Sequence, residues 1–118
     1  MTVCVERINA KIPRDALVIN TTSRSQGWSR GLSPFFAGPV DLYGGYSARN
    51  VENAWQFSKV YKQHINEEGS PTEEYFEWAK RGWSDDWAHR YPMGKGAIPQ
   101  YSWWDIIIRL SGCRMTMY

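Results

Sequence analysis

The segment from Asn50 to Asn66 constrains the fold more than any other part of this chain. Apolar and small residues recur there at spacings of three and four, which predicts one long helix with a single face to bury. They are Val51, Ala54, Trp55, Ser58, Tyr61 and Ile65. A polar stripe runs beside this face and consists of Glu52, Gln56, Lys59 and Gln63. Ser47 or Asn50 can cap the start of the helix, and Gly69 follows its end.

The first third of the chain carries weaker signals. Roughly alternating apolar residues predict two strands, from Thr2 to Ile8 and from Ala16 to Thr22, with a turn at Ile12–Asp15 between them. From Ser23 to Gly45, aromatic residues stand in a stretch rich in Ser, Gly and Pro. That mixture predicts ordered loops and a short strand around Pro39–Tyr43, where the backbone can approach a ligand closely.

A second helix is expected after Ser70, which can cap it, with Pro71 in the first turn and Glu73 completing a capping box. Tyr75, Phe76 and Ala79 supply its apolar side, and Gly82 can close it.

The last part of the chain is predicted as a short helix over Ser84–Tyr91, a loop over Pro92–Pro99, and a strand or helix end within Tyr101–Tyr118, which holds the run Ile106–Ile108. Strands followed by helices predict an α+β class, with a small sheet and a prominent central helix.

Composition narrows the function classes. A chain of 118 residues is about one domain long and can bury a core without metals or disulfides. Seven Trp and seven Tyr supply rings for that core or for stacking on a ligand. The net charge is only +2, with both signs interspersed, which argues against tight duplex DNA binding but is compatible with a nucleotide.

The sequence also predicts the cellular location of the protein and its need for metals or cofactors. No apolar run approaches the roughly 20 residues of a membrane span, and the N-terminus lacks an apolar signal core, so a cytoplasmic protein is expected. Cys4 and Cys113 share no metal-type spacing, so reduced thiols are expected. Asp85, Asp86 and His89, with His64 further away, could suggest a metal site, but they look more like exposed residues at a helix start. We therefore expect no metal and no cofactor.

One part of the chain resembles a known family. Leu32-Ser33-Pro34-Phe35-Phe36 is followed by Gly44-Gly45 and then by the run from Val51 to Lys59, which reads V-E-x-x-x-Q-x-x-K. In order and helix spacing this resembles NADAR, or YbiA-like, domains over roughly a third of the chain. The resemblance implies a single NADAR-like domain over residues 1–118. Family domains are usually longer, so we expect a domain that is shortened at its C-terminal end. Residues 83–96 do not follow the family pattern.

The resemblance also implies an activity, which is hydrolysis of an N-glycosidic bond. Family substrates include ADP-ribosylated guanine and a ribosylated intermediate of riboflavin metabolism. The family's helix glutamate corresponds to Glu52, its glutamine to Gln56 and its lysine to Lys59. Trp83 and Asp105 are the candidates for the downstream Trp and Asp of family active sites.

The spacing of these three residues gives a physical reason to group them. Glu52, Gln56 and Lys59 stand at i, i+4 and i+7, so they can share one helical face and point into one pocket. Cleavage of an N-glycosidic bond develops oxocarbenium character, which the Glu52 carboxylate can stabilise while it activates water or attacks as a nucleophile. Gln56 can bond a ribose hydroxyl or a base edge, and Lys59 can bind phosphate or keep Glu52 ionised. The alternative is an ordinary solvated helix face.

Further binding candidates come from ring and charge chemistry. Some aromatic residues can stack on a base, although most Trp residues are expected in the core. They are Trp28, Phe35, Phe36 and Trp83. Arg30 and Lys95 each stand next to glycine and can meet phosphates, or simply lie in tight surface turns. Gly94-Lys95-Gly96 lacks the Walker pattern.

The leading hypothesis is an enzyme that removes ADP-ribose from a base. Its substrate is ADP-ribosylated or nucleotide-like and can be part of a nucleic acid. Such an activity would suit conflict between a phage and its host. A second hypothesis is an inactive module that binds a nucleotide or ADP-ribose. A third is a small docking or inhibitor protein whose exposed aromatic residues bind a protein partner.

Overall fold

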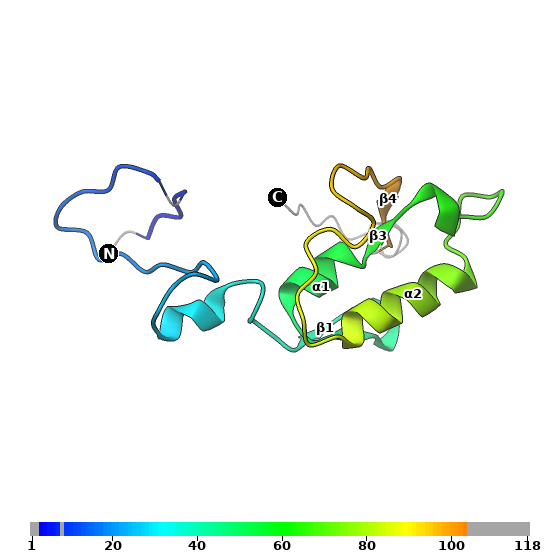
Figure 1. Cartoon of the computed structure of the whole chain (residues 1–118), viewed down its shortest axis with the longest axis horizontal. Coiled ribbons are helices and arrows are strands. Elements are labelled where there is room, and N and C mark those ends of the chain that lie inside the picture. The colour runs from blue at the N-terminus through cyan, green and yellow to red at the C-terminus, as the bar shows by residue number, and fades with distance from the viewer. Residues whose placement is uncertain (1–2, 8, 104–118) are drawn as a thin grey trace.

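The structure of the chain is a computed structural model, and it describes residues 3–7 and 9–103. Within these residues the protein is a small mixed helix-and-sheet structure with two α-helices and two antiparallel two-stranded sheets (Figure 1). The helices are α1 (Val51–Gln56) and α2 (Glu73–Ser84). The mixed class expected from the sequence is confirmed.

The two sheets are minimal. Strand β1 (Val40–Asp41) pairs with β2 (Ser47–Ala48), with Val40 opposite Ala48. Strand β3 (Lys59–Val60) pairs with β4 (Tyr101–Ser102), with Val60 opposite Tyr101. Three short 3₁₀ helices complete the described elements. They are η1 (Trp28–Leu32), η2 (Tyr43–Gly45) and η3 (Lys62–His64).

Helix α1 begins where the sequence predicts and ends much earlier. The Asn50 side chain caps it by accepting a hydrogen bond from the Asn53 amide at 2.8 Å. The predicted continuation to Asn66 is wrong, because the chain after Gln56 turns into β3. There the Ser58 and Val60 carbonyls accept hydrogen bonds from Trp103 and Gln100 at 2.7 and 2.8 Å. Pairing with a distant strand therefore replaces the helical hydrogen bonds that the local pattern favours.

Helix α2 is confirmed, but its ends differ from the prediction. Thr72, not Ser70, is the N-cap, and its hydroxyl accepts from the Tyr75 amide at 3.3 Å. Gly82 does not close the helix, which continues to Ser84. Gly82 instead lies against the Phe57 ring, where any side chain would clash.

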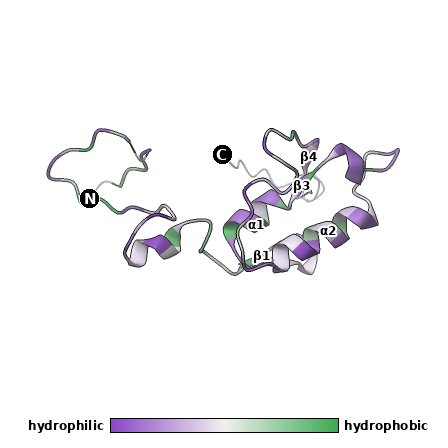
Figure 2. Cartoon of the chain, viewed as in Figure 1, coloured by the Kyte–Doolittle hydropathy of each residue, from purple (hydrophilic) through white to green (hydrophobic). Residues whose placement is uncertain are grey.

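The first part of the chain forms an arm that runs apart from the two helices (Figure 1). Neither predicted strand exists within the described residues 3–7 and 16–22. The turn between them is confirmed by a hydrogen bond from the Ala16 amide to the Pro13 carbonyl at 3.1 Å. Val3, Val5 and Leu17 are exposed, and Figure 2 shows hydrophobic segments along this arm. Strand propensity alone fails here because, among the described residues, no neighbouring strand supplies a ladder of hydrogen bonds.

The other predictions are mixed in outcome. The short strand near Pro39–Tyr43 is confirmed as β1, and residues 92–99 form the predicted loop. The helix expected over Ser84–Tyr91 is wrong, because the chain leaves α2 at Asp85 in an extended conformation. Tyr101–Ser102 is a strand, whereas Ile106–Ile108, Asp105 and Cys113 lie outside the described residues.

The core lies between α1, α2 and the two sheets and is largely aromatic. Trp83, Tyr75 and Trp103 are at most 6 % exposed, and the Tyr75 hydroxyl donates to the Phe57 carbonyl at 2.9 Å. Among the described Trp residues, Trp83 and Trp103 belong to the core and Trp78 packs against it, as expected, whereas Trp28, Trp55 and Trp87 are exposed. Among the residues the structure describes, no helix has the length and apolar character needed to cross a membrane.

Candidate functional site

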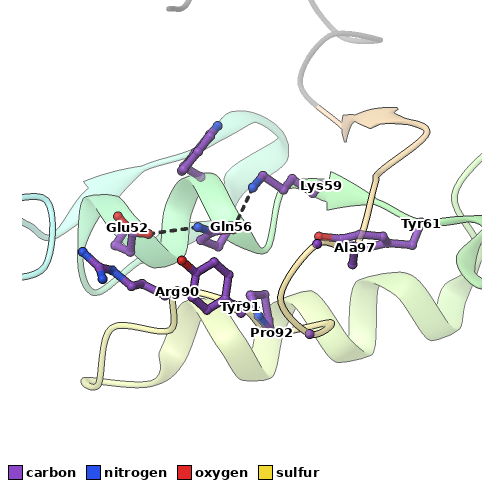
Figure 3. Close-up of a pocket in the computed structure, with 11 residues that line it drawn as sticks. Glu52, Gln56, Lys59, Tyr61, Arg90, Tyr91, Pro92 and Ala97 are labelled. Atoms are coloured by element: carbon purple, nitrogen blue, oxygen red, sulfur yellow. Dashed lines mark hydrogen bonds between the residues drawn. The ribbon is translucent and has the colours of Figure 1, made fainter.

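A pocket of about 440 Å³ opens beside α1 (Figure 3). One wall comes from α1 and the segment that follows it, with Glu52, Trp55, Gln56, Lys59 and Tyr61. The opposite wall is the loop that follows α2, with Arg90, Tyr91, Pro92, Gly94, Gly96 and Ala97. A carboxylate, two cations and several rings thus meet in one hollow.

Three side chains on the first wall form a chain of hydrogen bonds. Gln56 Nε2 donates to Glu52 Oε1 at 3.0 Å, and Lys59 Nζ donates to Gln56 Oε1 at 2.8 Å. The amide orientation follows from its neighbours, because a carboxylate only accepts and an ammonium only donates. Gln56 is 6 % exposed, so its amide is fixed between the two charges.

The structure brings Glu52, Gln56 and Lys59 together, but not by the expected route. The sequence predicts a continuous helix with all three residues on one face. In the structure α1 ends at Gln56, and Lys59 belongs to β3. The Lys59 side chain returns to Gln56 from the strand (Figure 3).

The ammonium group of Lys59 is partly desolvated by its surroundings. Its ammonium lies 4.0 Å from the centre of the Trp55 ring, a cation–π distance. Partial burial lowers the pKa of Lys59, and the Glu52 carboxylate partly opposes that shift. Lys59 is therefore a partly desolvated cation at the pocket wall.

The second wall is connected to the predicted aromatic motif. The Arg90 guanidinium lies 5.2 Å from the centre of the Phe35 ring, so Phe35 supports a pocket residue without lining the pocket itself. Tyr91 is 55 % exposed and lines the pocket.

The remaining predicted binding residues do not line this pocket. Arg30 stacks over Phe36 at 4.5 Å, and the pair stands apart from the pocket lining. Trp83 is 1 % exposed in the core, where a ligand cannot reach it. Lys95 is exposed between two lining glycines but is not itself in the lining. Trp28 is exposed on η1 and does not line it either.

Sequence reasoning missed Trp55, Tyr61, Arg90 and Tyr91 as pocket residues. Trp55 was assigned to the buried face of the helix, yet it is 44 % exposed. Arg90 and Tyr91 were assigned to a helix, although the following Pro92 disfavours helical geometry at Tyr91 and could have indicated a loop.

Acidic and histidine side chains near the pocket form pairs. His89 Nε2 and Asp85 Oδ2 are 2.7 Å apart, and this hydrogen bond, helped by the Trp87 amide, lowers the pKa of Asp85. Asp86 forms an exposed ion pair with Arg49 at 3.6 Å. In the described part of the chain no group of three or more His, Cys, Asp or Glu residues could hold a metal ion.

Comparisons of this chain with protein-family models, curated proteins and solved structures found no match.

Proposed function

We propose that this protein is a NADAR-like N-glycosidase that removes ADP-ribose from a base, with Glu52 as its catalytic carboxylate. The observation that carries the proposal is the hydrogen-bonded chain Glu52–Gln56–Lys59 along one wall of a pocket. The same three residues correspond to the family motif. A NADAR fold over residues 1–118, a cytoplasmic location and a role in phage–host conflict belong to this proposal.

The proposed reaction is a hydrolysis at the anomeric carbon of the ribose. The bond from this carbon to the base nitrogen breaks, the electron pair leaves with the base, and the sugar gains oxocarbenium character. Glu52 stabilises that charge and either takes a proton from the attacking water or attacks first as a nucleophile. Water supplies the hydroxyl for the sugar, and its proton ends on the departing base.

The other pocket residues fit the remaining parts of such a substrate. Lys59 and Arg90 carry positive charge on opposite walls and suit a pyrophosphate. Trp55 and Tyr91 present exposed rings on which a base can stack, an interaction worth about 1–3 kcal/mol per base. Gln56 is held in place to bond a ribose hydroxyl.

The test compares wild type, Glu52→Gln and Glu68→Gln on a DNA oligonucleotide carrying ADP-ribosylated guanine, with released ADP-ribose followed by mass spectrometry. Glu68 is exposed and outside the pocket, so its variant is the matched control for loss of one carboxylate. We expect Glu52→Gln to lower the rate by about 10²–10⁴-fold, in the range of general acid–base catalysis, with the control unchanged.

Two results would overturn the enzyme proposal. No release by wild type, combined with a higher unfolding temperature in free ADP-ribose, would indicate the binding module instead. No release and no effect of ADP-ribose would indicate a docking protein. Circular dichroism of all three proteins shows whether each is folded.

A further inference from the structure

We propose that Asn53, which does not line the pocket, is a positioning residue that fixes the wall formed by Arg90 and Tyr91 and thereby sets the affinity for substrate. The inference rests on the proposed function for its kinetic consequence. The structural claim, that a buried amide fixes one wall of the pocket, can be tested without any substrate.

The Asn53 side chain is fully buried and bonded only to the backbone of the segment after α2. Its Nδ2 donates to the carbonyls of Asp85 and Trp87 at 3.2 and 2.8 Å. Its Oδ1 accepts from the His89 amide at 2.8 Å. Both amide hydrogens and the carbonyl oxygen are therefore used on one five-residue segment.

Few other hydrogen bonds hold the shape of this segment. Residues 85–91 contain no helix or strand, so their backbone groups lack regular partners. The other links are weaker or exposed. Among the polar links, Asn50 Nδ2 donates to the Asp86 carbonyl at 3.4 Å, the Asp85 amide donates to the Gly82 carbonyl at 3.3 Å, and the Trp87 amide donates to the Asp85 carboxylate. The His89–Asp85 and Arg49–Asp86 pairs are exposed. Two ring contacts add to these links, because His89 packs edge-on against Phe57 at 5.6 Å and Arg90 lies over Phe35 at 5.2 Å. Exposed ion pairs stabilise little, so the buried Asn53 amide is the main polar anchor of this segment.

The anchor ends directly beside the pocket. His89, the last residue that Asn53 holds, is followed by Arg90 and Tyr91, which face Glu52 and Gln56 in Figure 3. Asn53 is also the neighbour of Glu52 in α1. One helical turn therefore carries the proposed catalytic carboxylate and the bonds that set the distance to the opposite wall.

Asn53→Asp separates positioning from packing because the two side chains have nearly the same shape. The aspartate can still accept from the His89 amide but loses both donors and turns a carboxylate oxygen toward the carbonyls of Asp85 and Trp87. Asn66→Asp controls for the added charge, since exposed Asn66 uses only its Oδ1, which accepts from Glu68 and Ser70.

The experiment measures kcat and KM on the ADP-ribosylated oligonucleotide, and amide hydrogen exchange without substrate. We expect Asn53→Asp to raise KM by about tenfold or more with kcat within about threefold, the signature of lost uniform binding. Exchange should quicken in residues 85–91 while α2 keeps its protection. Asn66→Asp should match wild type, and Glu52→Gln should lower kcat instead.

Several outcomes would overturn the inference. Unchanged KM and unchanged hydrogen exchange in Asn53→Asp would refute the positioning role. A lower unfolding temperature and a lower kcat at constant KM would also refute it, because they indicate a merely structural role. If Asn53→Asp does not fold, Asn53→Ser decides, because it adds no charge and its single short hydroxyl cannot keep all three bonds to Asp85, Trp87 and His89. It should raise KM about threefold, and an unchanged KM would refute the inference.

The two proposals fail in distinguishable ways. If wild type releases no ADP-ribose, the proposed function and the kinetic consequence fall together. Faster exchange of residues 85–91 in Asn53→Asp would still support the anchoring of the wall, whereas unchanged exchange would overturn that as well.

Discussion

Replacing Gly82 with alanine tests how tightly α1 and α2 are packed. Gly82 is buried inside α2, and a Cβ atom there would lie 2.1 Å from Cδ1 and 2.3 Å from Cγ of Phe57. Carbon atoms in contact normally stay about 3.5–4.0 Å apart. The Phe57 ring has little room to move, because it is 5 % exposed and packs against Trp78 at 4.8 Å and against His89 at 5.6 Å.

Two opposing effects decide the size of the change. Alanine in place of glycine inside a helix gains about 1 kcal/mol from helix propensity. Overpacking a core usually costs about 1–3 kcal/mol, and the upper end applies here because the contact is with the base of a buried ring. The net expectation for Gly82→Ala is a loss of about 2 kcal/mol, or roughly 8 °C in Tm at about 4 °C per kcal/mol for a domain of this size.

The assay is thermal and urea unfolding followed by circular dichroism. Gly31→Ala is the matched control, since nothing lies within 4 Å of a Cβ there. It should stay within about 0.5 kcal/mol of wild type. Adding Phe57→Leu to Gly82→Ala should recover part of the loss through coupling of neighbours. A Tm at or above the wild-type value for Gly82→Ala would refute the packing argument.

Three further predictions follow from single contacts. Tyr75→Phe keeps the buried ring but leaves the Phe57 carbonyl without its partner, so urea unfolding should show a loss of about 1–2 kcal/mol, and no loss would contradict the role of this bond. Burial chiefly lowers the pKa of His64, so the unfolded state binds more protons and the free energy of unfolding should decline as pH falls through about 6.5. His64→Phe should flatten this pH dependence between about pH 7.5 and 5.5. An equally steep pH dependence in the variant would count against this role of His64. The hydrogen bond from His89 chiefly lowers the pKa of Asp85, so the ionised carboxylate stabilises the fold above about pH 3.9. This stabilisation is lost as pH falls through the lowered pKa. Asp85→Asn should therefore flatten the acid-unfolding curve in that range, and identical curves for the variant and wild type would exclude a contribution from Asp85.

Features that depend on neighbouring residues were predictable from the sequence. The Asn50 cap and the body of α2 follow from side chains within one or two turns. The turn after Pro13 and the loop over residues 92–99 follow from proline and glycine. In these places the decisive interactions are local, so the sequence pattern contains them.

Features that depend on distant partners were not predictable. The end of α1 is set by β4, whose residues lie far along the chain and supply hydrogen bonds that the helical pattern cannot reveal. The apolar residues of the N-terminal arm carry strand propensity, but within the described residues no strand pairs with them.

The site divides in the same way. The sequence alone grouped Glu52, Gln56 and Lys59 as candidates, through the motif and the assumed helical spacing, although Lys59 reaches the pocket from β3. Only the tertiary structure added Arg90 and Tyr91, since a buried amide on α1 holds the segment before them across the pocket. The sequence determines the type and spacing of the side chains on one wall of the pocket. The opposite wall depends on which distant backbone groups the fold brings within hydrogen-bonding distance.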